Sequence, residues 1–174
     1  MELKSIYKSA ANDGLIFGGY LTAIFISYVL ASVNVMFAWV LNLLILAIPY
    51  VTYRFIRRCN KGRFNCMSIS EMWMYGMLLY IYGALICGIV TFAYIRFIEP
   101  NLITNQLQMA LDIYKSVDEL KDSEFVAVVE QGIEQGLVPS AIDFVIQMMW
   151  VTSFFGSVLS LIIALIIRLI NRNK

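Results

Sequence analysis

The sequence predicts an all-α integral membrane protein with four transmembrane helices and an extracytoplasmic amphipathic helical hairpin between the third and fourth spans. The first observation is a set of runs without Lys, Arg, Asp or Glu, which cover Gly14–Val33, Val35–Tyr53, Met72–Ile95 and Phe144–Ile167. Each run is about 19 to 24 residues long, and a helix needs roughly 20 residues to cross a hydrocarbon core of ~30 Å. The second observation is the composition, since 60% of the residues are hydrophobic and 14% are charged, against roughly 45–50% and about 25% in soluble domains.

A third observation is that the charges divide between the two sides of the predicted bundle. Ten of the thirteen Lys and Arg residues fall at the amino end, in the loop after the second span and at the carboxyl end. With four spans these segments share one side, and positive charge resists translocation, so that side is expected to be cytoplasmic. Nine of the twelve acids lie in or beside the segment between the third and fourth spans. We therefore expect a single membrane domain over 1–174, with both termini cytoplasmic and the segment 99–140 on the opposite side.

Small residues are spaced for close helix contact in the first and fourth spans. The first span opens with Gly14 and Gly18, and Asp13 just before them is expected to cap the helix or to favour its positive end. A stripe of small residues runs down the fourth span at Gly156, Ser160 and Ala164. Such spacing lets backbones approach within a membrane, and we expect it to serve packing inside the bundle rather than an oligomer interface.

The third span begins with a capping-box pattern, Ser68-Ile-Ser-Glu71. In this pattern the Ser side chain binds the amide of the Glu, and the Glu side chain binds the amide of the Ser. Glu71 is therefore expected to cap a helix rather than to carry protons. No ionisable residue is expected in the middle of a span, which argues against a proton-coupled or ion-driven carrier.

The segment between the third and fourth spans carries two apolar stripes at helical spacing. The first includes Ile103, Leu107 and Tyr114, and the second includes Val126 and Ile133. Each stripe has a polar back, so a pair of amphipathic helices is predicted. We expect them to pack together over the outer ends of the spans or to contact another protein. The residues expected in such contacts are Leu107, Tyr114, Glu130, Ile133 and Glu134.

The sequence offers little for catalysis or cofactor binding. It contains no His, which removes the commonest general base and most catalytic zinc sites. Its three cysteines are Cys59, Cys66 and Cys87, and none forms a CxxC pair. We expect no enzyme, no cofactor, no metal and no nucleic-acid partner. The expected partners are the lipid bilayer and either an envelope protein or a second copy of the chain.

Several motifs resemble the family of domain of unknown function 4199. They include Ser5-Ile-Tyr-Lys-Ser-Ala, Gly14-Leu-Ile-Phe-Gly-Gly, Met67-Ser-Ile-Ser-Glu-Met and Phe155-Gly-Ser-Val-Leu-Ser-Leu-Ile-Ile-Ala164. The most distinctive is Tyr94-Ile-Arg-Phe-Ile-Glu-Pro100 at the end of the third span. The resemblance implies the inner membrane of a Gram-negative bacterium, with the outer segment in the periplasm. It implies no activity and no catalytic residues.

Two functions of different classes remain open. The first is a non-catalytic interaction or assembly protein, whose bundle anchors the acidic outer helices for contact with a partner. The second is a small transporter or channel component that conducts only as an oligomer. In the second case Asn42, Gln147 and Ser153 are the polar residues expected to line the path.

Overall fold

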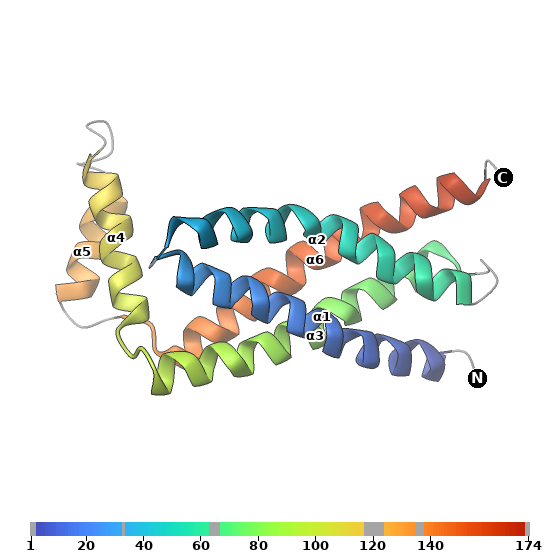
Figure 1. Cartoon of the computed structure of the whole chain (residues 1–174), viewed down its shortest axis with the longest axis horizontal. Helices are drawn as coiled ribbons and strands as arrows, with labels where there is room; N and C mark the ends of the chain where they lie inside the picture. The colour runs from blue at the N-terminus through green and yellow to red at the C-terminus, as the bar shows by residue number, and fades with distance from the viewer. Residues whose placement is uncertain (1–2, 33, 63–66, 117–123, 135–137, 173–174) are drawn as a thin grey trace. The chain divides into compact units, whose positions relative to one another are not determined.

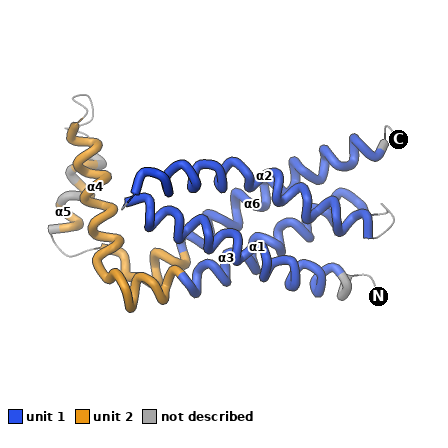
Figure 2. Tube along the Cα trace, in the orientation of Figure 1, with its two compact units in different colours: residues 1–90, 147–174 blue, residues 91–146 orange. Residues whose placement is uncertain are grey.

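The computed structural model describes residues 3–32, 34–62, 67–116, 124–134 and 138–172. Within these ranges all regular structure is helical, as predicted (Figure 1). The helices are α1 (Leu3–Ala31), α2 (Val35–Gly62), α3 (Ile69–Phe97), α4 (Leu102–Ser116), α5 (Glu124–Glu134) and α6 (Ala141–Arg172). The chain forms two compact units, which Figure 2 shows in blue and orange. Unit 1 comprises residues 1–90 and 147–174, and unit 2 comprises residues 91–146.

Four of the described helices are long and apolar enough to cross a membrane, which confirms the predicted spans. The segments that qualify are Ile6–Ala31, Val35–Gly62, Ile69–Phe97 and Ala141–Asn171. They are longer than the uncharged runs because the helices continue into charged residues. For example, α2 passes Arg54 and Arg58 before it ends at Gly62. Arg and Lys are good helix formers, so an uncharged run marks only the part of a helix that matches hydrocarbon.

In unit 1, one end of the four long helices gathers most of the described basic residues. Figure 1 shows the start of α1, the end of α2, the start of α3 and the end of α6 at this end. The described basic residues toward it are Lys8, Arg54, Arg57, Arg58, Lys61 and Arg168. The fold of unit 1 thus places together the basic segments that the sequence assigns to one side.

Glycines bring α1 and α3 into close contact. A Cβ atom at Gly14 would lie 2.6 Å from Cβ of Tyr82, and one at Gly18 would lie 2.8 Å from Cβ of Ile86. Both distances are below 3.0 Å, a separation that real Cβ atoms essentially never show. The Gly14 and Gly18 pair therefore serves helix packing within one chain, as expected.

The stripe of small residues in α6 packs against α3 in the same way. A Cβ atom at Gly156 would lie 2.1 Å from Cγ of Tyr80, and one at Gly76 would lie 2.5 Å from Cβ of Ser160. Ser160 and Ala164 are fully buried. Close backbone approach and van der Waals contact are the main attraction between helices in a lipid environment.

The amino-terminal cap of α3 confirms the predicted capping box. The Ser68 amide donates to Oε2 of Glu71 at 2.7 Å, and the Glu71 amide donates to Oγ of Ser68 at 3.2 Å. A similar cap begins α6, where the Asp143 amide donates to Oγ of Ser140 at 3.3 Å. The Ser140 hydroxyl in turn donates to Oδ2 of Asp143 at 2.5 Å. This second cap was not predicted, although its Ser-x-x-Asp spacing is the same local signal.

Removing the cap of α3 is expected to weaken the fold measurably. Ser68→Ala leaves the Glu71 amide without its side-chain acceptor, and such a substitution costs about 1 kcal/mol. Thermal unfolding in detergent should show the loss, and hydrogen exchange should become faster in the first turn of α3. Ser70→Ala, one position inside the helix on an exposed side chain, is the control. Equal effects of the two substitutions would contradict the cap.

In unit 2, α4 and α5 are distinct helices that pack against each other. The buried apolar residues of this pair are Leu102, Ile103, Leu111 and Val126. Leu107 and Ile133 are half-buried, whereas Tyr114 is 38% exposed. The buried side of α4 thus follows Ile103 and Leu111 more closely than the predicted stripe through Tyr114.

Candidate functional site

The end of α3 is held by a side-chain contact between Tyr94 and Glu99. The Tyr94 hydroxyl donates to Oε2 of Glu99 at 3.2 Å, and the Glu99 amide donates to the carbonyl oxygen of Tyr94 at 3.1 Å. The carbonyl oxygen of Glu99 then accepts the Leu102 amide at 3.1 Å, across Pro100. Pro100 lacks an amide hydrogen and cannot continue the α3 ladder. This contact explains in structural terms why Tyr, Glu and Pro are combined in the most distinctive motif.

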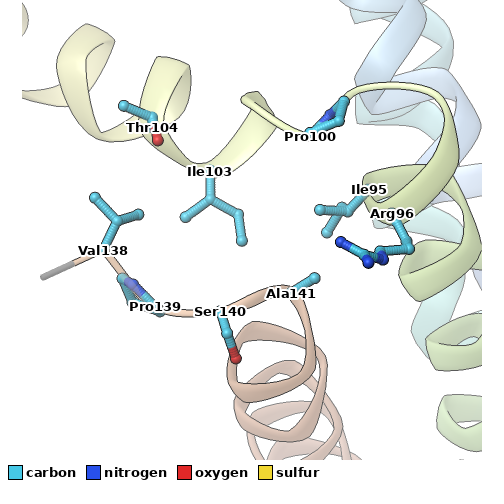
Figure 3. A pocket seen from close by; sticks show the side chains of 9 residues that line it. All are labelled: Ile95, Arg96, Pro100, Ile103, Thr104, Val138, Pro139, Ser140 and Ala141. Carbon is cyan, nitrogen blue, oxygen red and sulfur yellow. The ribbon is translucent and has the colours of Figure 1, made fainter. Parts of the chain in front are cut away.

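Beside this turn lies a cavity of about 270 Å³ within unit 2 (Figure 3). Its apolar wall is built from the end of α3, from α4 and from the segment before α6, with Ile95, Pro100, Ile103, Val138, Pro139 and Ala141. Its polar residues are Arg96, Thr104 and Ser140. Figure 3 shows the Arg96 guanidinium reaching toward the centre of the cavity, opposite Ile103. The Ser140 side chain points away from the cavity, consistent with its cap bond to Asp143.

Arg96 is the cation of this cavity, and the acids near it have other partners. Glu99 accepts the Tyr94 hydroxyl, and Asp143 accepts the Ser140 hydroxyl. Within the part of unit 2 that the structure describes, no carboxylate pairs with Arg96. The arrangement combines an apolar wall with one guanidinium, which is suited to holding an anionic group attached to an apolar body.

A second polar site lies in unit 1, and it corrects the expectation for Asp13. Helix α1 begins at Leu3, so Asp13 lies inside the helix and does not cap it. The Tyr75 hydroxyl of α3 donates to Oδ2 of Asp13 at 2.6 Å. Tyr75 is fully buried, and Arg58 and Cys59 of α2 lie within electrostatic range of its hydroxyl. Asp13 therefore lies within the candidate span Ile6–Ala31, near its amino end, rather than before the span as expected.

Polar and aromatic side chains also meet in the interior of unit 1. The Tyr80 hydroxyl and Oγ1 of Thr52 are 2.8 Å apart, and Phe17 meets the Tyr80 ring edge-on at 4.8 Å. The Tyr20 hydroxyl of α1 donates to the carbonyl oxygen of Leu44 in α2. These contacts join α1, α2 and α3, and they satisfy the hydroxyl groups of Tyr80, Thr52 and Tyr20.

The residues expected in partner or cap contacts all belong to α4 and α5. Leu107 is half-buried and Tyr114 exposed on α4, while Ile133 is half-buried on α5. Glu130 and Glu134 belong to α5, but their side chains lie outside the described residues.

The residues expected to line a path are spread over two helices of unit 1. Asn42 is exposed on α2, where its Nδ2 donates to the Ala38 carbonyl oxygen of the same helix at 2.8 Å. Gln147 is exposed and Ser153 is half-buried on α6. Exposed side chains can line a conduction path only if another copy of the chain covers them. The alternative function, a channel or transporter component that conducts as an oligomer, requires such a second copy.

The described residues hold no group of three or more His, Cys, Asp or Glu side chains placed to bind a metal ion. Cys59 and Cys87 are present as thiols, and Cys66 lies outside the described residues.

These features define an all-helical protein whose four long apolar helices are compatible with several passes through a membrane. The chain belongs to the family described as protein of unknown function (DUF4199), whose family model matches residues 12–168. The match confirms the resemblance based on the Tyr94–Pro100 stretch and the other motifs. No curated protein and no solved structure matches the chain.

Proposed function

We propose that this protein is a non-catalytic component of the bacterial inner membrane that acts through contacts of its α4–α5 pair with another protein. In this proposal the four long helices anchor the chain in the bilayer. Both termini face the cytoplasm, and α4 and α5 face the periplasm.

The charge distribution supports this orientation. The basic residues of α1, α2 and α6 lie toward one end of unit 1, and lysine and arginine near membrane helices favour the cytoplasmic side. The segment that contains α4 and α5 is rich in acids. A helix that lies flat on anionic lipid normally carries Lys and Arg on its polar face, whereas Lys115 and Lys121 are the only basic residues among the acids of segment 99–140.

The observation that carries the proposed function is an apolar surface on the outer side of α4. Met109 is 53% exposed and Ile113 is 66% exposed, and the two are one helical turn apart. They lie outside the buried stripe that runs through Ile103 and Leu111, below the buried Leu102 at the start of the helix. Helix α4 therefore keeps exposed apolar side chains beside its buried stripe, whereas a solvated amphipathic helix needs only the buried stripe. Adjacent exposed apolar side chains mark a protein or a membrane contact, and the acidic character of this segment favours a protein.

A photo-crosslinking experiment in living cells tests the proposal. A benzophenone amino acid at Ile113 is expected to give a covalent adduct of discrete mass, because this side chain would lie in the contact. The same amino acid at Gln108, an exposed polar position of α4, should give much less of that adduct. Mass spectrometry of the adduct then separates a second copy of the chain from a different envelope protein. Equal crosslinking at both positions, or none at either, would show that this side of α4 is not a specific contact.

A further inference from the structure

We propose that the cavity beside Arg96 binds the phosphodiester headgroup of a membrane phospholipid. The inference goes beyond the protein contact of α4, and it rests on the proposed membrane embedding. It concerns the cavity of unit 2 lined by Ile95, Arg96, Ile103, Thr104, Val138 and Ala141.

The cavity contains the two kinds of surface that such a ligand requires. The Arg96 guanidinium points toward its centre, and Thr104 adds a hydroxyl group at its edge (Figure 3). Guanidinium groups bind phosphate oxygens through paired, charge-assisted hydrogen bonds. The apolar side chains of Ile95 and Ile103 provide the wall against which the glycerol and the first acyl carbons would lie.

The position of Arg96 matches the depth of lipid phosphates. It is the last residue but one of the candidate span Ile69–Phe97. A residue at the end of a membrane helix lies at the interface, where the headgroups are. An arginine there usually reaches out along the helix to bulk headgroups. Arg96, which is exposed, instead points into a partly open cavity whose wall comes from three segments of unit 2.

The size of the cavity and the charges around it favour a headgroup over other ligands. A volume of about 270 Å³ is at the lower limit of the roughly 300–1,000 Å³ typical of small-molecule sites. It suits a headgroup whose acyl chains remain in the bilayer. The acids that lie nearest in sequence, Glu99 and Asp143, accept hydrogen bonds from Tyr94 and Ser140. Among the described residues no carboxylate pairs with the guanidinium, so it is available to an anion from outside the protein.

Native mass spectrometry of the full-length protein in a non-ionic detergent tests this site. The protein is titrated with dioleoyl phosphatidylglycerol, and the first bound lipid is followed. Arg96→Gln is expected to weaken that binding by about tenfold or more, because a charge-assisted pair is lost. Ala141→Trp keeps the arginine but fills the cavity, and it is expected to weaken binding as well. Circular dichroism checks that both variants keep their helix content.

Three comparisons make the result specific. Arg168→Gln removes an arginine near the carboxyl end of α6, which does not line the cavity, and it should leave the first binding step unchanged. Dioleoylglycerol has the same acyl chains without a phosphate, and it should bind much more weakly. Inorganic phosphate alone should neither bind at this step nor displace the lipid.

Several outcomes would overturn the proposal. Equal lipid binding by the wild type and Arg96→Gln would show that Arg96 does not contribute to lipid binding. Equal losses in Arg96→Gln and Arg168→Gln would indicate general interfacial charge. Equal binding of dioleoylglycerol would exclude phosphate recognition, and displacement by inorganic phosphate would assign the site to a free anion. The titration uses purified protein without a partner, so failure of the α4 contact would not affect it.

Discussion

Replacing Gly156 with alanine is expected to destabilise the bundle by about 1–3 kcal/mol, the cost typical of overpacking a tight core. The added Cβ would lie 2.1 Å from Cγ of Tyr80, at the root of the ring rather than at a flexible tip. Tyr80 has little freedom to move, because its hydroxyl is bonded to Thr52 and its ring packs against Phe17. Helices α3 and α6 must therefore separate. Thermal unfolding of the purified protein in detergent measures the loss.

The matched control is Gly19→Ala in α1. No atom lies within 4 Å of a Cβ built at Gly19, so the substitution creates no clash. Alanine is also the better helix former, by roughly 0.5–1 kcal/mol. Gly19→Ala should therefore unfold at the wild-type temperature or slightly above it. A Gly156→Ala protein as stable as this control would show that α6 does not approach α3 as closely as described.

The second large effect is expected at the hydrogen bond between Tyr75 and Asp13. Tyr75→Phe removes the hydroxyl that donates to Asp13 at 2.6 Å and leaves the carboxylate without this donor inside a candidate span. The expected loss is about 1.5 kcal/mol, the lower end of the range for a hydrogen bond to a charged group, because Asp13 is half-buried. Tyr50→Phe is the control, since Tyr50 is 61% exposed on α2.

A double-mutant cycle separates this bond from other effects of the two substitutions. Asp13→Ala and Tyr75→Phe should each destabilise the protein, and the double variant should lose less than the sum of the two. Unfolding in detergent provides the free energies. Strictly additive losses would mean that the two residues contribute independently and that the bond does not stabilise the fold.

The sequence was sufficient to predict the features that follow from local chemistry. Uncharged runs of membrane length predicted four spans, and the structure has four helices of suitable length and composition. The Ser68–Glu71 pattern predicted a helix cap, which the structure confirms. The spacing of Gly14 and Gly18 gave a packing face, which meets α3. Each of these signals depends on residues within a few turns of one helix, where periodicity and spacing are informative.

Contacts between distant parts of the chain were beyond local reasoning. Asp13 was expected at a helix terminus because the uncharged run starts at Gly14, but α1 begins a full ten residues earlier. Its partner Tyr75 is 62 residues away in sequence, and no local pattern relates the two. The tyrosines inside the spans were the available signal, since a buried hydroxyl requires a partner. The sequence could not specify that partner.

The candidate site was predictable only in part for the same reason. Pro100 and the polar turn signalled the end of α3. The cavity beside Arg96, however, requires Val138 and Ala141, about forty residues further along the chain. The exposed face of α4 was also missed. Met109 and Ile113 are flanked by acids and amides. The prediction for α4 was based on the more regular apolar stripe through Ile103 and Leu107, which does not include them.

Thiol labelling of spheroplasts tests whether the long helices cross the inner membrane and place α4 outside it. In a background without Cys59, Cys66 and Cys87, single cysteines replace Asn105 of α4 and Lys61 of α2, both exposed residues. A membrane-impermeant maleimide is predicted to label Asn105→Cys in intact spheroplasts and Lys61→Cys only after lysis. Labelling of Lys61→Cys in intact spheroplasts, with Asn105→Cys protected until lysis, would contradict the account.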